Sequence, residues 1–229
     1  MTANIAVVIG ATGGIGAALL DRLRAEAKFE QVVGLSRNGS PRLDLTDETS
    51  IAACAAHVSG LGNPRLVIDA TGVLALGGAG PEKSWRQLDA ARLAAQFAVN
   101  AIGPALLMKH FLPLFPRQGR AVFATLSARV GSIGDNRLGG WYGYRASKAA
   151  LNQLVRTASI ELARTRPEAI CVALHPGTVT TELSRPFVER GPNLVSVEIA
   201  AERLIVVIDD LRVSETGGFF DQNGAVVPW

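Results

Sequence analysis

The segment YRASK holds two side chains whose spacing could support proton transfer. Tyr144 and Lys148 are four positions apart, and residues at this spacing share one face of an α-helix, which turns once in about 3.6 residues. A free phenol titrates near pH ~10, and a nearby positive charge favours its anionic form. We therefore predict that Lys148 lowers the pKa of Tyr144 and that Tyr144 acts as a general acid or base. Tyr142, the only other tyrosine, is six positions from Lys148 and falls on another part of the helix.

A glycine-rich turn, GATGGIG, directly follows the apolar run that ends at Ile9. In a dinucleotide-binding fold the turn after the first strand needs residues without Cβ atoms, so that the backbone can approach a pyrophosphate at the amide-rich end of the next helix. The spacing fits both GxxxGxG and GxxGxxG, and a turn that only tightens a strand–helix junction is the alternative. The candidate nucleotide contacts in this turn are Gly10, Thr12, Gly14, Ile15 and Gly16.

The end of the second apolar run, LSRNG, predicts the cofactor preference. An NAD-selective site usually places a carboxylate there for the ribose 2′-hydroxyl, whereas an arginine suits a 2′-phosphate. Arg37 therefore favours NADP(H), with NAD(H) as the alternative if Arg37 is only a solvated loop charge. Gly13 supplies no second cation from the glycine turn.

Alternating strands and helices must position these residues. Apolar, β-rich runs predict strands at residues 5–9, 31–35, 66–68, 121–126, 170–174 and near 219–220, with a short extra strand at 42–43. Helical periodicity predicts helices at residues 15–28, 48–58, 85–114, 143–163 and 198–209. This alternation predicts an α/β chain, a three-layer doubly wound Rossmann fold with about seven mostly parallel strands and helices on both faces. We expect one domain over residues 1–229.

Bulk composition narrows the class of protein. The chain has 229 residues, 48% of them hydrophobic, and 23 Lys and Arg against 20 Asp and Glu. This mild excess without a basic stripe gives no indication of nucleic-acid binding. Cys54 and Cys171 are far apart and have no Cys/His cluster, so we expect neither a disulfide framework nor a metal site. We expect a soluble, cytoplasmic protein with no membrane partner.

The motifs in this order resemble the short-chain dehydrogenase/reductase family over the whole chain. GATGGIG resembles the family's cofactor loop, and YRASK matches its catalytic tyrosine and lysine. Asp44 and Leu45 in LDLTD resemble the family's adenine-side acidic pair. Asn100 in VNAIGP resembles the family's helix asparagine. HPGTVTT resembles the turn beside the nicotinamide, for which the candidate contacts are Pro176, Gly177, Val179 and Thr181. SARVGSIGDN, GGWYGYRASKAALN and GGFFDQNGAVVPW are most similar to the C-factor-like and sniffer-like branch, which includes carbonyl reductases.

The resemblance implies roles for three residues. Tyr144 would exchange a proton with the substrate oxygen while hydride passes to or from the nicotinamide, Lys148 would hold the ribose, and Asn100 would keep a water in the proton path. Pro104 has no N–H for the carbonyl of Asn100, so a helix that runs through Pro104 leaves this acceptor for another partner such as water. A simple bend at Gly103 and Pro104 is the alternative.

The serine that binds the substrate oxygen in the family is displaced in this sequence. It usually stands second in a Ser-Ser pair, which here reads Ser127-Ala128. Ser127 is the first candidate, although successive strand residues point to opposite faces and its hydroxyl could point away from the substrate. Ser132 in the following loop is the second candidate, and both hydroxyls could instead only stabilise the turn.

The family's Asn-Asn-Ala-Gly segment appears here as Asp69-Ala70-Thr71-Gly72. By resemblance, Ala70 and Gly72 are candidate contacts to the adenosine ribose. Asp69 is predicted to have a structural role, accepting backbone N–H groups and holding neighbouring strands together. His175 is predicted to be a hydrogen-bonded structural histidine instead of a catalytic one.

The predicted function is an NADP(H)-dependent oxidoreductase that acts on a carbonyl or secondary alcohol, with Tyr144 assisted by Lys148 and Asn100. The first alternative is a nucleotide-binding signalling or redox-sensing protein of the C-factor type with little or no turnover. A nucleotide-sugar epimerase or dehydratase is suggested by GxxGxxG, but little chain follows HPGTVTT to form a sugar-binding lobe.

The substrate and the oligomeric state are the least specified properties. The segment 182–197 is predicted to cover the pocket, but its mixture of Leu183, Phe187, Arg185 and Arg190 selects no compound. Leu183 and Phe187 favour an apolar carbonyl. The resemblance also implies a possible homodimer through the helices that contain Asn100 and Tyr144.

Overall fold

The computed structural model describes residues 3–75, 80–181 and 194–229. Its main sheet has six strands in the order β2-β1-β3-β4-β5-β8, and every neighbouring pair is parallel. The strands are β1 (Asn4–Ile9), β2 (Gln31–Leu35), β3 (Asn63–Asp69), β4 (Ala121–Leu126), β5 (Ala169–His175) and β8 (Phe219–Asp221). A separate parallel pair is formed by β6 (Thr178–Val179) and β7 (Leu194–Val195).

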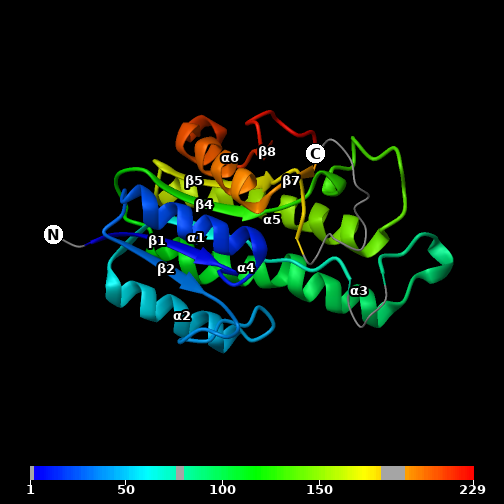
Figure 1. Cartoon of the computed structure of the whole chain (residues 1–229), viewed down its shortest axis with the longest axis horizontal. Helices are drawn as coiled ribbons and strands as arrows, with labels where there is room; N and C mark the ends of the chain where they lie inside the picture. The colour runs from blue at the N-terminus through cyan, green and yellow to red at the C-terminus, as the bar shows by residue number, and fades with distance from the viewer. Residues whose placement is uncertain (1–2, 76–79, 182–193) are drawn as a thin grey trace.

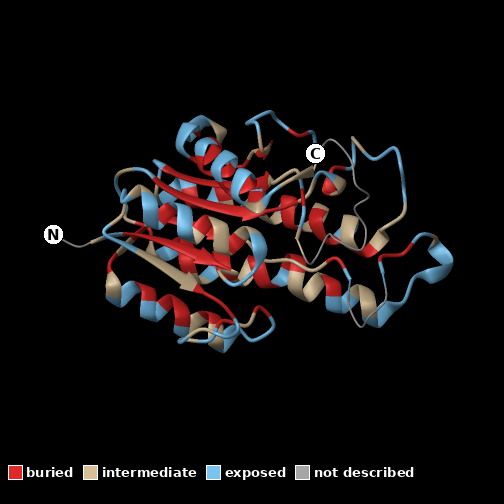
Figure 2. Ribbon diagram, in the orientation of Figure 1, coloured by how far each residue is buried: buried red, intermediate tan, exposed pale blue. Residues whose placement is uncertain are grey.

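Helices cover both faces of the main sheet, which gives three layers (Figure 1). On one face α1 (Gly14–Glu26) and α6 (Val197–Asp210) bury Leu19, Leu23 and Leu204 against alternate strand residues such as Ala6 and Val8. On the other face lie α2 (Glu48–Leu61), α4 (Gly103–Phe111) and α5 (Tyr142–Thr165), which bury Ile51, Phe111 and Leu151 against Val7 and Phe123. Figure 2 shows the strands as a largely buried layer between exposed outer helix faces. The predicted doubly wound α/β fold is confirmed.

The carboxyl ends of the central strands meet at one edge of the sheet. Ile9 pairs with both Leu35 and Asp69, and Asp69 pairs with Thr125. The connections that leave these strands therefore start side by side, and in parallel α/β sheets this edge is where ligands bind. The glycine turn, the Arg37 loop, the Ala70–Gly72 segment and the Ser127 loop all begin there.

The main sheet of the described residues has one strand fewer than the predicted total of about seven. The expected strand at residues 42–43 is reduced to a single parallel bridge between Ser36 and Arg42. Only a few residues separate the end of β2 from Leu43, which is too little chain for the crossover that two fully paired parallel strands require. β2 is therefore an edge strand that pairs only with β1 in the described sheet.

The helix predicted over residues 85–114 is interrupted. A short 3-10 turn, η1 (Trp85–Gln87), precedes α3 (Ala90–Phe97). Asp89 fixes the start of α3, because the Asp89 side chain accepts a hydrogen bond from the Arg92 N–H at 2.9 Å. A π-helical turn, η2 (Ala98–Ile102), then leads into α4, and a 3-10 turn, η3 (Leu112–Leu114), follows it. The run Ala90–Leu114 is long and apolar enough to cross a membrane by length and composition, but it packs against α5 as a core helix does.

Candidate active site

The glycine turn is built by close backbone approach. Gly10 has a φ of +83°, which an L side chain rarely adopts. A Cβ atom on Gly16 would lie 2.1 Å from the carbonyl oxygen of Gly10, so no other residue fits there without movement. The cap residue of α1, Gly13, makes no side-chain cap, and the first turn of α1 contains no acidic residue. The amide-rich end of α1, including Gly14 and Ile15, is therefore suited to an anion.

Segments from distant parts of the sequence reach this turn. A Cβ atom on Gly10 would be 3.1 Å from the carbonyl oxygen of Ala70, and one on Gly14 would be 3.2 Å from Cγ2 of Thr181. Thr12 is exposed on the turn, while Val179 is buried in β6. The structure thus brings predicted contacts that follow β1, β3 and β5 to one place.

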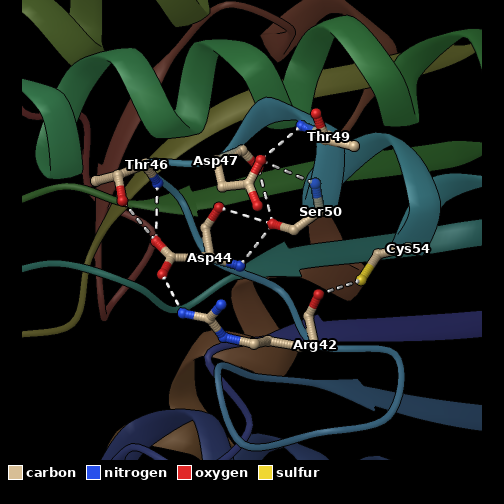
Figure 3. Close-up of polar contacts among 7 residues, drawn as sticks. All are labelled: Arg42, Asp44, Thr46, Asp47, Thr49, Ser50 and Cys54. Atoms are coloured by element: carbon tan, nitrogen blue, oxygen red, sulfur yellow. Dashed lines mark hydrogen bonds and ion pairs between the residues drawn. The ribbon is translucent and has the colours of Figure 1, made fainter.

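The connection after β2 forms the adenine-side candidate region (Figure 3). The carboxylate of Asp44 accepts hydrogen bonds from the N–H and hydroxyl of Thr46, at 3.0 and 2.7 Å, and from Nη2 of Arg42 at 2.7 Å. These bonds and the guanidinium charges of Arg42 and Arg37 hold the pKa of Asp44 below its ordinary value. Leu45 is buried and packs on the start of α4, because a Cβ atom added to Gly103 would lie 2.7 Å from the Cβ atom of Leu45.

Tyr144 and Lys148 lie on α5 as the spacing predicts, but the predicted pKa shift of the phenol is wrong. Burial raises the pKa of Tyr144 to about 12, and burial lowers the pKa of Lys148 to about 8. Nζ of Lys148 donates a hydrogen bond to the carbonyl of Leu126 at 2.7 Å. Burial, and not the lysine cation, therefore sets the direction of the pKa shift of the phenol.

Asp69 has the structural role that the sequence predicts. Its carboxylate accepts the N–H of Thr71 at 3.1 Å and the hydroxyl of Thr125, on the neighbouring strand β4, at 2.7 Å. Burial raises the pKa of this fully buried carboxyl, while the charge of Lys148 acts in the opposite direction. Lys148 reaches the same edge of the sheet, because a Cβ atom on Gly72 would be 3.4 Å from its Nζ.

Asn100 lies in the π-helical turn and is completely buried. Its side-chain oxygen accepts the N–H of Val73 at 2.8 Å, and its Nδ2 donates to the carbonyl of Val73 at 2.8 Å and to the hydroxyl of Ser147 at 3.2 Å. The amide thus joins the segment after β3 to α5. The helix continues through Pro104, so the carbonyl of Asn100 lacks the usual donor four residues later.

The two candidate serines have different hydrogen-bond partners. The hydroxyl of Ser127 donates to Oδ1 of Asn152 at 2.6 Å, and both residues are buried. The hydroxyl oxygen of Ser132 accepts the N–H of Asp135 at 3.1 Å, and no acceptor in the described part of the chain engages its proton. Ser132 therefore has a donor to offer, whereas the proton of Ser127 is engaged.

Glu82 is a residue of this region that sequence reasoning missed. Its carboxylate is 2% exposed and accepts the N–H of Gly143, in the first turn of α5, at 3.1 Å. Its backbone carbonyl accepts the N–H of Trp141 at 2.5 Å, and the Trp141 ring lies edge-on to Tyr144 with centroids 6.2 Å apart. Glu82 therefore caps the helix that holds the phenol, from 61 positions away in sequence.

The turn after β5 begins at His175, the last residue of that strand. Nδ1 of His175 is buried without a hydrogen-bond partner in the described residues, and burial lowers the pKa of the ring to about 4. Gly177 has a φ of +82°, and a Cβ atom there would be 2.6 Å from the side chain of Gln222, so Pro176 and Gly177 make a tight turn against the last strand. Within the predicted cover segment, residues 182–193, including Leu183, Arg185, Phe187 and Arg190, lie outside the described residues.

Comparison with known proteins identifies the family. A doubly wound parallel sheet with a glycine turn after its first strand is the architecture of dinucleotide-binding proteins. Residues 4–191 match the family described as short chain dehydrogenase. The chain therefore belongs to the short-chain dehydrogenase family of oxidoreductases, as its motifs predict.

Three similar proteins illustrate the relationship. C-signal of Myxococcus xanthus is 37% identical over 143 residues, which are 62% of this chain and 81% of that protein. A 1-hydroxy-2-glutathionyl-2-methyl-3-butene dehydrogenase of Rhodococcus sp. (strain AD45) is 32% identical over 82% of this chain and 79% of its own length. The crystal structure of NADPH-bound carbonyl reductase from chicken fatty liver superposes with a TM-score of 0.87 at 26% identity, covering 99% of this chain and 94% of that one. These likenesses agree with the predicted branch.

Proposed function

We propose that this protein is an NADP(H)-dependent oxidoreductase that reduces a carbonyl compound to a secondary alcohol. The observation that supports this most is the position of Lys148. Its Nζ lies beside Gly72 and the carboxyl end of β4, at the same edge of the sheet as the glycine turn, and Tyr144 is one helical turn away. A proton donor and a nucleotide cradle at one edge are what hydride transfer to a carbonyl requires.

The residues present fit a dinucleotide. The turn has room only for backbone, because a Cβ atom on Gly16 would lie 2.1 Å from the carbonyl oxygen of Gly10. The N-terminus of α1 also has no side-chain cap of its own. Gly10, Gly14 and Ile15 would hold the pyrophosphate there, Ala70 and Gly72 would lie beside the adenosine ribose, and Arg37 would face a 2′-phosphate. The bound cofactor would supply the hydride.

The protonation state of Tyr144 suits the reducing direction. With a pKa of about 12 the phenol is protonated at neutral pH and can donate its proton to a carbonyl oxygen. Lys148, with a pKa of about 8, is mostly cationic at neutral pH and can stabilise the phenolate that remains. Ser132 is the favoured hydroxyl for orienting the carbonyl, because its proton is available while that of Ser127 is bonded to Asn152.

Known proteins support the chemical class. The chicken carbonyl reductase binds NADPH, and the Rhodococcus relative is a dehydrogenase. A second candidate is a signalling protein that binds nucleotide with little turnover. The 37% identity to C-signal and the presence of Ala128 at the family's serine position favour it.

The experiment that tests the proposal combines nucleotide titration with a matched pair of tyrosine variants. We expect the purified protein to bind NADPH more tightly than NADH and to consume NADPH with members of a carbonyl panel. Tyr144→Phe should lower turnover by about 100-fold or more while leaving the dissociation constant for NADPH nearly unchanged. Tyr142→Phe, in the same helical turn, should retain full turnover.

The outcomes separate the two candidates. Full turnover by Tyr144→Phe would reject the proton-transfer role, and tight NADPH binding without turnover on any carbonyl would favour the signalling function.

A further inference from the structure

The connection between β2 and Leu43 is a short reversal that places two arginines close together. Gly39 and Leu43 both donate their N–H groups to the carbonyl of Ser36, at 3.1 and 2.9 Å, and Ser36 is bridged to Arg42. The chain therefore leaves the end of β2 at Arg37 and returns to the same point at Arg42. This is the carboxyl edge of the sheet, where the glycine turn also begins.

Both guanidinium groups act on one carboxylate and remain accessible. Arg37 is exposed, and the Arg42 side chain is 61% exposed. Arg42 donates to Oδ2 of Asp44 at 2.7 Å, and the charges of Arg42 and Arg37 both lower the pKa of Asp44. Two exposed cations thus lie on the connection that follows β2, and Figure 3 shows the bond of one of them, Arg42, to Asp44.

The bond to Asp44 leaves Arg42 able to bind another anion. An exposed ion pair contributes only about 0–1 kcal/mol, so its rearrangement is inexpensive. Arginine has five N–H donors, and the bond from Nη2 to Asp44 uses only one of them. Asp44 also remains satisfied if Arg42 turns away, because its other oxygen accepts the N–H and the hydroxyl of Thr46.

We propose that Arg42 is a second determinant of cofactor selectivity, which binds the ribose 2′-phosphate of NADP(H) together with Arg37. The inference rests on the proposed NADP(H) dependence. A phosphate monoester carries close to two negative charges and is bound best by bidentate guanidinium groups. NADH offers only a hydroxyl at this position, so it gains nothing from the second arginine.

The test measures binding and does not depend on turnover. The dissociation constants of NADPH, NADH, adenosine 2′-monophosphate and adenosine 5′-monophosphate are measured by calorimetry for the wild type, Arg42→Met and Arg37→Met. Methionine keeps most of the apolar stem and removes the charge. Arg24→Met, which changes an exposed arginine on α1, is the matched control for the loss of one positive charge.

We expect Arg42→Met to weaken NADPH and adenosine 2′-monophosphate by about tenfold or more, and to leave NADH and adenosine 5′-monophosphate within about twofold. The salt dependence of NADPH binding should also become shallower in this variant. Arg24→Met should match the wild type for all four ligands.

Two results would overturn the role of Arg42 alone. They are an unchanged NADPH-to-NADH preference in Arg42→Met, and an equal loss of affinity for both nucleotides. A wild-type protein that shows no preference for NADPH would overturn the proposed cofactor together with this inference.

Discussion

The two ends of the candidate site are built in opposite ways. At the glycine turn, space is made by removing side chains, and the backbone of Gly10 and Gly16 comes into contact. At the α5 end, polar side chains are buried and hydrogen-bonded. Asn100 donates to the hydroxyl of Ser147, and Lys148 donates to the backbone carbonyl of Leu126. The first region can be damaged by adding a single carbon, and the second by deleting a single polar group.

This difference explains why the two regions differ in their electrostatics. The α1 terminus exposes N–H groups, and solvent or an anion can satisfy them. Around α5, burial raises the pKa of Asp69 and of Tyr144 and lowers the pKa of Lys148, so it favours the neutral form of each side chain. The anion-binding end therefore depends on shape, and the proton-transfer end depends on the balance between burial and charge.

The largest effect is expected from adding a methyl group to the glycine turn. Gly16→Ala places a Cβ atom 2.1 Å from the carbonyl oxygen of Gly10, and the backbone must move to accept it, at about 3 kcal/mol or more. Denaturant unfolding and NADPH titration should both show the loss. Gly60→Ala is the control, since a Cβ atom there meets nothing within 4 Å. Equal behaviour of the two variants would contradict this account of the turn.

The next effect concerns the two serines at the α5 end. Ser132→Ala should lower kcat/KM by about tenfold to 100-fold, because it removes the available hydroxyl donor. Ser127→Ala should have a smaller effect on kcat/KM and should destabilise the fold, because Asn152 then loses its bonded partner in the core. Steady-state kinetics and thermal unfolding of both variants would separate the roles. A larger kinetic loss in Ser127→Ala would restore it as the first candidate.

Loss of the cap on α5 should have an intermediate effect. Glu82→Ala removes the acceptor for the Gly143 N–H and should cost about 1–2 kcal/mol of stability, whereas Glu82→Gln keeps an acceptor and should cost less. Asp89→Ala removes a comparable cap from α3 and serves as the control. If Glu82 positions Tyr144, kcat falls in Glu82→Ala, recovers in Glu82→Gln and is unchanged in Asp89→Ala. A loss of stability without a change in kcat would show that the cap is purely structural.

The smallest effect is a pH dependence of stability from Lys148. Its pKa is about 8 in the folded chain against an ordinary value of 10.5. Between these values the unfolded chain binds a proton that the folded chain has released, so this lysine makes stability rise with pH and opposes folding below the window. From pH 9 to pH 10 the wild type should gain about 1 kcal/mol relative to Lys148→Met in denaturant titrations. Lys83→Met, at an exposed lysine, should follow the wild type.

The regular part of the fold could be predicted because its determinants are local. The bounds of β2 and β4 agree with the apolar runs, and the ends of α2 and α6 lie close to the predicted ones. The break between Trp85 and Ala90 was missed, because an apolar stretch with helical periodicity does not indicate where a polar cap such as Asp89 will start a new helix. The strand at residues 42–43 was overpredicted, because β propensity says nothing about the chain length needed for a crossover.

The site could be predicted where a motif defines it and not where burial does. The spacing of Tyr144 and Lys148 placed both on α5, and the predicted bonds of Asp69 are present. The predicted lowering of the Tyr144 pKa was wrong, since a four-residue spacing gives no information on how deeply the phenol is buried. Glu82 was missed because its contact with Gly143 joins segments 61 positions apart, and only the Pro-Glu pair before an exposed lysine marks it in the sequence.

The opposite charges of Asp69 and Lys148 also couple the folding of two layers. Asp69 ends a strand and Lys148 belongs to a helix that covers the sheet, and each is buried within reach of the other's charge. If α5 separated from the sheet, the carboxylate of Asp69 would lose its counter-charge, and such a partly unfolded state is costly. The amides of β3 and α5 should therefore exchange with deuterium in one cooperative opening, while those of the edge strand β2 exchange independently.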